Sequence, residues 1–177
     1  MKLLKLIFPL IIVYLLSSSS TYSIEQPNIK NLVFYKENKK LDNIEFKNSI
    51  NKTINLNSYS DKLIILNFWA TWCAPCLEEM PTFEKLYRRY RSQGLTVLAV
   101  SLDKGNSEKV KKFTDSNNFT FPVLLDSKGI AETRYPSFTI PFTYVIDKKG
   151  RIAARVDGAK NWATNETFEA LEILVKG

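Results

Sequence analysis

Residues 63–76 read LIILNFWATWCAPC and decide the fold. The run over residues 63–69 is apolar apart from Asn67, which is typical of a strand buried on both faces of a largely parallel sheet. Two cysteines follow directly. An amphipathic stretch over residues 78–92 predicts a helix that begins near Cys73. The sequence therefore places a Cys-x-x-Cys pair between a buried strand and a helix.

Strand and helix patterns alternate around this segment. Further strands are predicted at residues 44–46, 53–56, 95–100, 121–125, 142–147 and 151–157, and further helices at about 107–117, 130–135 and from Thr164 onward. The first two strands flank a polar turn and predict a hairpin, and in the last helix the residues expected to pack inward are Phe168, Leu171, Ile173 and Leu174. We expect a single α/β domain over residues 41–177, a mixed sheet flanked by helices with an N-terminal β-hairpin and a central helix and strand insert.

The first 40 residues differ in character from the rest. Lys2 and Lys5 precede an apolar run over residues 6–16, and small residues follow up to Ser23. This pattern is typical of a secretory signal peptide over residues 1–23, cleaved after Ser20 or Ser23. A retained membrane anchor is the alternative, although the run falls short of the roughly 20 residues that span a bilayer. Residues 24–40 are polar and predict a flexible leader. We expect an exported, periplasmic protein.

The composition excludes several classes of function. The chain has two cysteines and no histidine, so it lacks the four ligands of a structural zinc site and the imidazole of a Ser-His-Asp or Cys-His hydrolase. No metal site and no cofactor are predicted. The net charge of +7 comes from scattered lysines and arginines. A well-solvated surface accounts for that charge, so no nucleic-acid partner is expected.

The position of the cysteines predicts redox chemistry. Unpaired backbone N–H groups at a helix start stabilise an anion, so the Cys73 thiol is expected to have a pKa below the roughly 8.5 of a free cysteine. Cys76 would then attack the mixed disulfide that Cys73 forms with a partner. The alternative is a structural disulfide, but a bridge between residues three apart closes too short a loop to stabilise a fold appreciably.

Three segments carry a family resemblance. Residues 68–76, FWATWCAPC, resemble the thioredoxin-superfamily active site, residues 77–81, LEEMP, resemble its exported TlpA/ResA-like branch, and residues 140–147, IPFTYVID, resemble its cis-proline loop. The resemblance spans about residues 41–175. It implies that the Ile140–Pro141 bond is cis, that Pro141 faces the disulfide, and that Trp72, Ile140 and Pro141 bind the substrate polypeptide.

Glu79 is the candidate proton acceptor. Cytosolic thioredoxins carry a buried aspartate at the position of Asn67, which cannot titrate. Glu79 lies three residues after Cys76, on the same helix face, and the family has a glutamate in a similar place. A partly buried carboxylate there could accept the Cys76 proton. The alternative is a solvated glutamate that complements the helix dipole.

The resemblance also implies a direction and a client. No His or Lys lies between the cysteines to stabilise the reduced form, which favours a protein-disulfide reductase. The family implies apocytochrome c or a copper-site assembly protein as substrate and a membrane thiol carrier as electron donor. One rival function is a copper-binding chaperone that uses the Cys73 and Cys76 thiolates as soft ligands. A thiol peroxidase is disfavoured because its Pro-x-x-x-Thr/Ser-x-x-Cys arrangement is absent.

Overall fold

The computed structural model describes residues 33–34, 40, 42–135, 137 and 139–176, so the predicted signal peptide lies outside the described residues. The strands are β1 (Val33–Phe34), β2 (Glu45–Asn48), β3 (Thr53–Asn55), β4 (Leu63–Trp69), β5 (Leu95–Ser101), β6 (Val123–Leu125), β7 (Phe142–Ile146) and β8 (Ile152–Asp157). The α-helices are α1 (Ala74–Tyr90), α2 (Ser107–Ser116), α3 (Ile130–Arg134) and α4 (Asn165–Lys176), and two 3₁₀ turns cover Leu56–Tyr59 and Arg91–Gln93.

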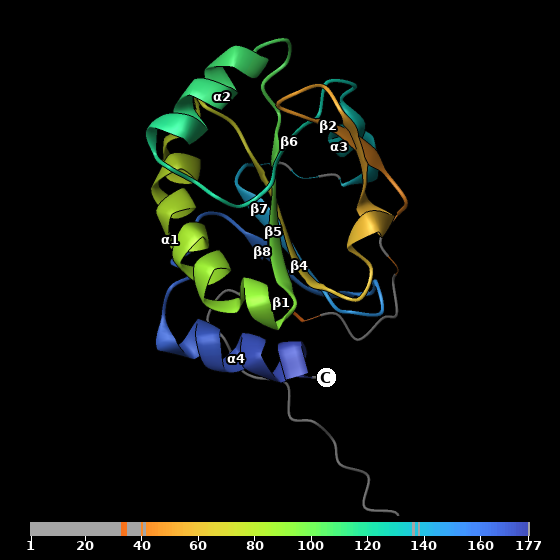
Figure 1. The fold of residues 1–177 in the computed structure, drawn as a ribbon, viewed down its shortest axis with the longest axis vertical. Coiled ribbons are helices and arrows are strands. Elements are labelled where there is room, and N and C mark those ends of the chain that lie inside the picture. Colours follow the sequence, from red (N-terminus) through yellow and green to blue (C-terminus); the bar gives the residue numbers. More distant parts are fainter. Residues whose placement is uncertain (1–32, 35–39, 41, 136, 138, 177) are drawn as a thin grey trace, which may run out of the picture.

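All described strands join one mixed sheet in the order β1-β8-β7-β4-β5-β6-β2-β3. The central strand β4 pairs in parallel with β5 and antiparallel with β7. The hairpin of β2 and β3 adds to the edge at β6. Figure 1 shows this sheet nearly edge-on, with α1 and α2 on one side and α3 on the other. The structure thus confirms the mixed α/β sheet with an N-terminal hairpin and a central insert.

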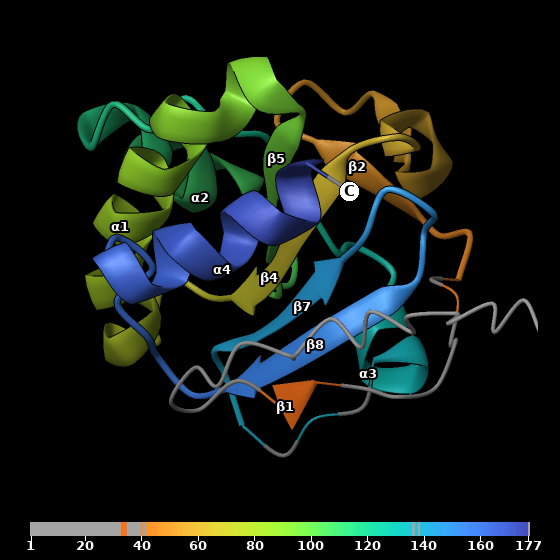
Figure 2. The same ribbon diagram turned by 90° about the horizontal axis from the view of Figure 1, so that it is seen from below.

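The alternation of side chains along β4 builds two separate cores. Leu63, Ile65 and Trp69 pack under α1 and α4, in a cluster that includes Met80 and Leu171. The residues between them pack on the opposite face against α3 and the hairpin; they are Ile64, Leu66 and Phe68. Figure 2 shows α1 and α4 together on one side of the strands. A strand buried on both faces needs the nearly continuous apolar run that the sequence has. Asn67 alternates with the residues that pack under α1, so its side chain points into the same core.

The element boundaries differ from the prediction in a few places. β2 continues to Asn48 because Lys47 and Asn48 pair with β6. β6 begins only at Val123, directly after Pro122, whose ring lacks the N–H that a ladder uses. Asn106 caps α2 by accepting from the Lys109 N–H group.

The predicted inward face of the last helix is wrong at one residue. Leu171 is buried, whereas Ile173 is 47% exposed. Residues 171 and 173 differ by about 200° around a helix of 3.6 residues per turn, so they cannot share one face.

The predicted leader contains a small part of the sheet. Val33–Phe34 forms β1 and pairs with β8 at Arg155 and Ala154. Lys40 forms an isolated bridge with Arg151. The other residues between 24 and 40 lie outside the described part. Among the described residues, no helix has the length and apolar character needed to cross a membrane.

Candidate active site

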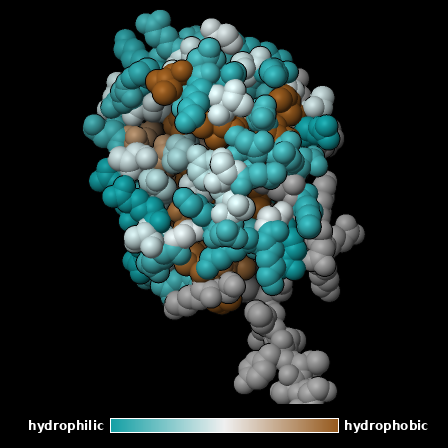
Figure 3. Space-filling model, turned by 45° about the vertical axis from the view of Figure 1, so that its right-hand side comes forward, coloured by the Kyte–Doolittle hydropathy of each residue, from teal (hydrophilic) through white to brown (hydrophobic). Residues whose placement is uncertain are grey.

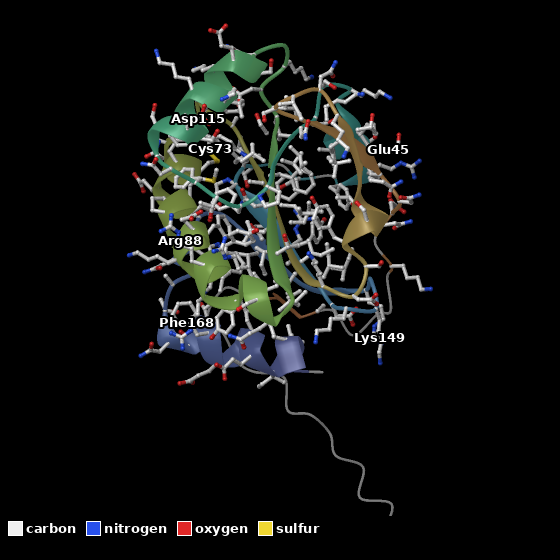
Figure 4. All side chains as sticks on the ribbon, viewed as in Figure 1. Glu45, Cys73, Arg88, Asp115, Lys149 and Phe168 are labelled. Carbon is white, nitrogen blue, oxygen red and sulfur yellow. A yellow bond between two sulfur atoms is a disulfide. The ribbon has the colours of Figure 1, made fainter. Side chains whose placement is uncertain are left out.

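The two cysteines lie at the N-terminal end of α1, where Figure 4 labels Cys73. Cys73 is the N-cap residue, and its Sγ atom accepts a hydrogen bond of 3.3 Å from the Cys76 N–H group. The two sulfurs form a disulfide with an S–S distance of 2.06 Å. Cys73 is 6% exposed, whereas Cys76 is fully buried. Both cysteines are therefore buried, and Cys73 alone keeps a small exposed area, at the N-terminus of α1.

A carboxylate holds the loop between β4 and the cysteines in place. Asp103, just after β5, accepts hydrogen bonds from the Thr71 N–H group at 2.9 Å and from the Thr71 hydroxyl at 2.6 Å. It also accepts from the Ser101 hydroxyl at 2.8 Å. The Leu102 N–H group donates to the Trp69 carbonyl at 2.8 Å. These bonds fix the loop that leads into Cys73.

The loop before β7 lies against the sulfur of Cys73. The Ile140–Pro141 bond is cis, as the resemblance implies. The Ile140 carbonyl oxygen lies 3.7 Å from Cys73 Sγ. Within the described residues Ile140 forms no backbone hydrogen bond, whereas the Pro141 carbonyl accepts from the Gly158 N–H group at 2.9 Å.

Trp72 directly precedes Cys73 in the chain. It is 67% exposed, one of three exposed large apolar residues in the described part of the chain, together with Ile50 and Ile173. Figure 3 shows polar residues over most of the face in view, with apolar residues only in small separate areas. Few large apolar side chains are therefore as exposed as this indole beside the cysteine pair.

Glu79 lies in the core beneath the disulfide, not at the surface. It is 2% exposed, which contradicts the solvated alternative. Its Oε1 atom accepts from Asn67 Nδ2 at 2.8 Å. Its Oε2 atom accepts from the Lys160 backbone N–H at 3.1 Å and from Trp162 Nε1 at 3.3 Å. Among the described residues, no hydrogen bond joins Glu79 to either sulfur.

Burial controls the acidity of this group. Desolvation raises the pKa of Glu79 from 4.5 to about 7, and the hydrogen bonds from Lys160, Trp162 and Asn67 oppose part of that rise. At neutral pH the side chain can therefore both accept and release a proton, which a surface glutamate with its ordinary pKa cannot do efficiently.

Several residues of the site were not identified from the sequence alone. Asn67 cannot titrate, and the structure shows that it donates to both Glu79 and Thr143. Trp162 is fully buried, and its backbone N–H donates to the Thr82 hydroxyl. The sequence offers two signals: Asn67 is a polar break in an otherwise apolar strand, and residues 158–162 resemble the same family branch. Within the described part of the chain, no group of three or more His, Cys, Asp or Glu residues could hold a metal ion.

Known proteins resemble the chain in sequence and in fold. Residues 38–155 match the AhpC/TSA family. The thiol-disulfide oxidoreductase ResA of Bacillus cereus is 30% identical over 176 residues, which cover 99% of this chain and 98% of that protein. A second ResA, from Oceanobacillus iheyensis, is 42% identical over 107 residues, which cover 60% of this chain and 55% of that protein.

A solved structure shares the fold. A DsbF homologue from Corynebacterium diphtheriae is similar with a TM-score of 0.71 and 24% identity, over 84% of this chain and 96% of that chain. These likenesses, together with the Cys73–Cys76 pair, settle the class of chemistry. The chain belongs to the AhpC/TSA family of thioredoxin-like fold and is a thiol-disulfide oxidoreductase.

Proposed function

We propose that the protein reduces disulfides in other proteins, with Cys73 as the nucleophile. The observation that carries this proposal is that Cys73 is the N-cap of α1 and the cysteine of the pair that keeps some exposed area, 6% against 0% for Cys76. In the reduced protein, the Cys73 thiolate attacks one sulfur of the substrate disulfide. A mixed disulfide forms, and the other substrate sulfur leaves as a thiolate.

The buried pair Cys76 and Glu79 completes the reaction. Glu79 accepts the Cys76 proton, directly after a small movement or through one water molecule, and the Cys76 thiolate attacks Cys73 Sγ. The Cys73–Cys76 disulfide forms, and the second substrate sulfur leaves. Two electrons pass from the protein to the substrate, and the structure has the oxidised product state.

Trp72, Ile140 and Pro141 form the surface on which the substrate chain binds. The Ile140 backbone is adjacent to Cys73 and forms no backbone–backbone hydrogen bond within the described residues, so an extended polypeptide can pair with it. The exposed indole of Trp72, the residue before Cys73, supplies apolar contact to the substrate.

The client and the compartment are part of the proposal. The resemblance to the TlpA/ResA-like branch supports apocytochrome c or a copper-site assembly protein as the substrate, and a membrane thiol carrier as the electron donor.

The segment over residues 1–23 supports export to the periplasm. A leader over residues 24–40 and a catalytic domain over residues 41–177 follow it. N-terminal sequencing of the exported protein tests this directly, with residue 21 or 24 expected as the first residue.

Insulin reduction by dithiothreitol tests the activity. We expect the wild type to accelerate the reaction, the Cys73→Ser variant to be inactive, and the Cys76→Ser variant to accumulate a mixed disulfide. A reduction potential near about −270 mV agrees with a reductant, whereas one near about −120 mV would contradict that direction.

Copper binding and insulin reduction, measured on the same protein, distinguish the proposed reductase from a copper chaperone. A copper chaperone would bind the metal stoichiometrically through the two thiolates and would not accelerate insulin reduction. That result would overturn the proposed reductase.

A further inference from the structure

The hydrogen bonds around Glu79 determine which of its two oxygens can carry the proton. The groups that face Oε2 are the Lys160 backbone N–H and Trp162 Nε1–H, and neither can accept a hydrogen bond. Within the described residues, Oε1 is bonded to Asn67 alone. When Glu79 is protonated, its O–H group therefore lies on Oε1 and must find an acceptor on the Asn67 side.

The amide of Asn67 has such an acceptor, and it is unused. Asn67 is fully buried, and Nδ2 donates to Glu79 at 2.8 Å and to the Thr143 hydroxyl at 3.0 Å. The Oδ1 atom of Asn67 is buried and has no partner among the described residues. Buried amide oxygens without a partner are uncommon and call for an explanation.

We propose that Asn67 is a positioning residue whose amide turns over when Glu79 gains its proton. With Glu79 ionised, Nδ2 faces the carboxylate, as the structure has it. With Glu79 protonated, Oδ1 faces the carboxylic acid and accepts its O–H bond. Thr143 permits both states because a hydroxyl can accept from Nδ2 and can also donate to Oδ1.

With Glu79 ionised, the acceptor Oδ1 of Asn67 lacks a partner, and in the reversed orientation the two N–H groups of Nδ2 take its place, so both orientations carry a cost. The charge of Glu79 then decides which one is populated. An aspartate in the place of Asn67 would put a second ionisable carboxyl 2.8 Å from Glu79, and the two groups would share one proton. The amide avoids this coupling, so one group alone gains and loses the proton.

Within the described residues, no charged side chain is among the causes that shift the pKa of Glu79. Charged residues do lie on its own helix and on the segment after β8; they are Glu78, Glu84, Lys85, Arg88, Arg89 and Lys160. Burial and neutral hydrogen-bond donors account for the acidity of Glu79. The use of this arrangement in turnover rests on the proposed proton transfer from Cys76, whereas the amide reversal itself does not.

Side-chain NMR of the oxidised, full-length protein tests the reversal without turnover. We would follow the Asn67 NH₂ group and the Trp162 indole N–H from pH 5 to 9. We expect both to titrate with one midpoint, and the nuclear Overhauser contact between the Asn67 NH₂ group and Thr143 to be present above that midpoint and lost below it. Persistence of that contact at both ends of a Trp162 titration would overturn the proposal, as would the absence of any titration.

Two variants of Thr143 provide a matched test. Thr143→Val removes the hydroxyl that accepts from Asn67 Nδ2. When Glu79 is ionised, one N–H group of Asn67 then has no acceptor, and we expect this loss to change the proton-dissociation constant of Glu79 about tenfold. The midpoint should therefore rise by about one pH unit. Thr143→Ser keeps the hydroxyl and should titrate like the wild type. Equal midpoints in the two variants would overturn the proposal. Insulin reduction is measured separately at the same pH values. If the Asn67 amide reverses but the protein does not reduce insulin, the proposed function is refuted and the amide reversal is not.

Discussion

Burial of Glu79 makes its ionised form costly, and the same burial suits the residue to proton transfer at neutral pH. The carboxyl group is nearly fully buried and receives three hydrogen bonds, yet desolvation still outweighs them and raises its pKa to about 7. Folding thus favours the protonated form. The penalty appears when the group ionises inside the protein.

This shift predicts the pH dependence of stability. Between pH 4.5 and 7, the native state binds more protons at Glu79 than the unfolded state does, so the free energy of unfolding falls as the pH rises through this window. The loss should be about 3 kcal/mol and should level off above pH 7. Denaturant unfolding of the oxidised wild type and of Glu79→Gln measures it, and the variant should lack this fall.

The neighbouring residue supplies the control. Glu78 is exposed one position earlier on the same helix, so Glu78→Gln should retain the wild-type fall in stability. If Glu79→Gln and Glu78→Gln had the same pH profile, burial of Glu79 would not be the cause.

At the scale of elements, the site depends on bonds between loops that are distant in the sequence. Asp103 after β5 holds Thr71 before α1, through two hydrogen bonds across 32 residues. An asparagine has only one acceptor atom at this place and would direct an NH₂ group at a donor. The position of Cys73 therefore depends on a side chain in another loop.

We predict that Asp103→Asn lowers the free energy of unfolding by about 2 kcal/mol and slows insulin reduction several-fold. Thermal unfolding and the turnover assay check both effects. Asp115→Asn is the control, because Asp115 makes only an exposed pair with Lys111, and its loss should change stability by less than about 0.5 kcal/mol. Equal effects of the two substitutions would show that the hydrogen bonds from Thr71 to Asp103 do not hold the active-site loop in place.

The last helix gives a second pair of matched substitutions. Leu171 is 1% exposed in the α1 core, and Ile173 is 47% exposed on the other side of α4. Leu171→Ala should cost about 2 to 5 kcal/mol, whereas Ile173→Ala should cost well under 1 kcal/mol. Urea unfolding compares them, and a large loss with Ile173→Ala would show that α4 packs in another orientation.

The sequence predicted most of these elements because their signals are local. The continuous apolar run predicts β4, the 3.6-residue helical period predicts α1, and the cap residues predict the start of α2, each within a residue or two. The bond from Asn67 to Thr143 joins residues 76 apart, and that from Glu79 to Trp162 joins residues 83 apart. Local patterns carry no information on such pairs, so the surroundings of Glu79 required the fold.

At the scale of the whole molecule, the sheet order brings the reactive parts together. β4 lies between β5 and β7, so the start of α1, the loop after β5 and the loop before β7 meet at one end of the sheet. Figure 4 shows Cys73 at this end and Lys149, in the turn between β7 and β8, at the other. The sheet therefore places the cysteine pair at one of its ends.

The central claim is that, in the reduced protein, the start of α1 stabilises Cys73 as a thiolate that a substrate can reach. The most direct measurement is the pH dependence of alkylation by iodoacetamide in the folded, reduced protein, with mass spectrometry to assign each cysteine. We predict that Cys73 reacts first and with a midpoint clearly below about 8.5, whereas Cys76 reacts slowly. Midpoints at or above about 8.5 for both thiols would contradict the account.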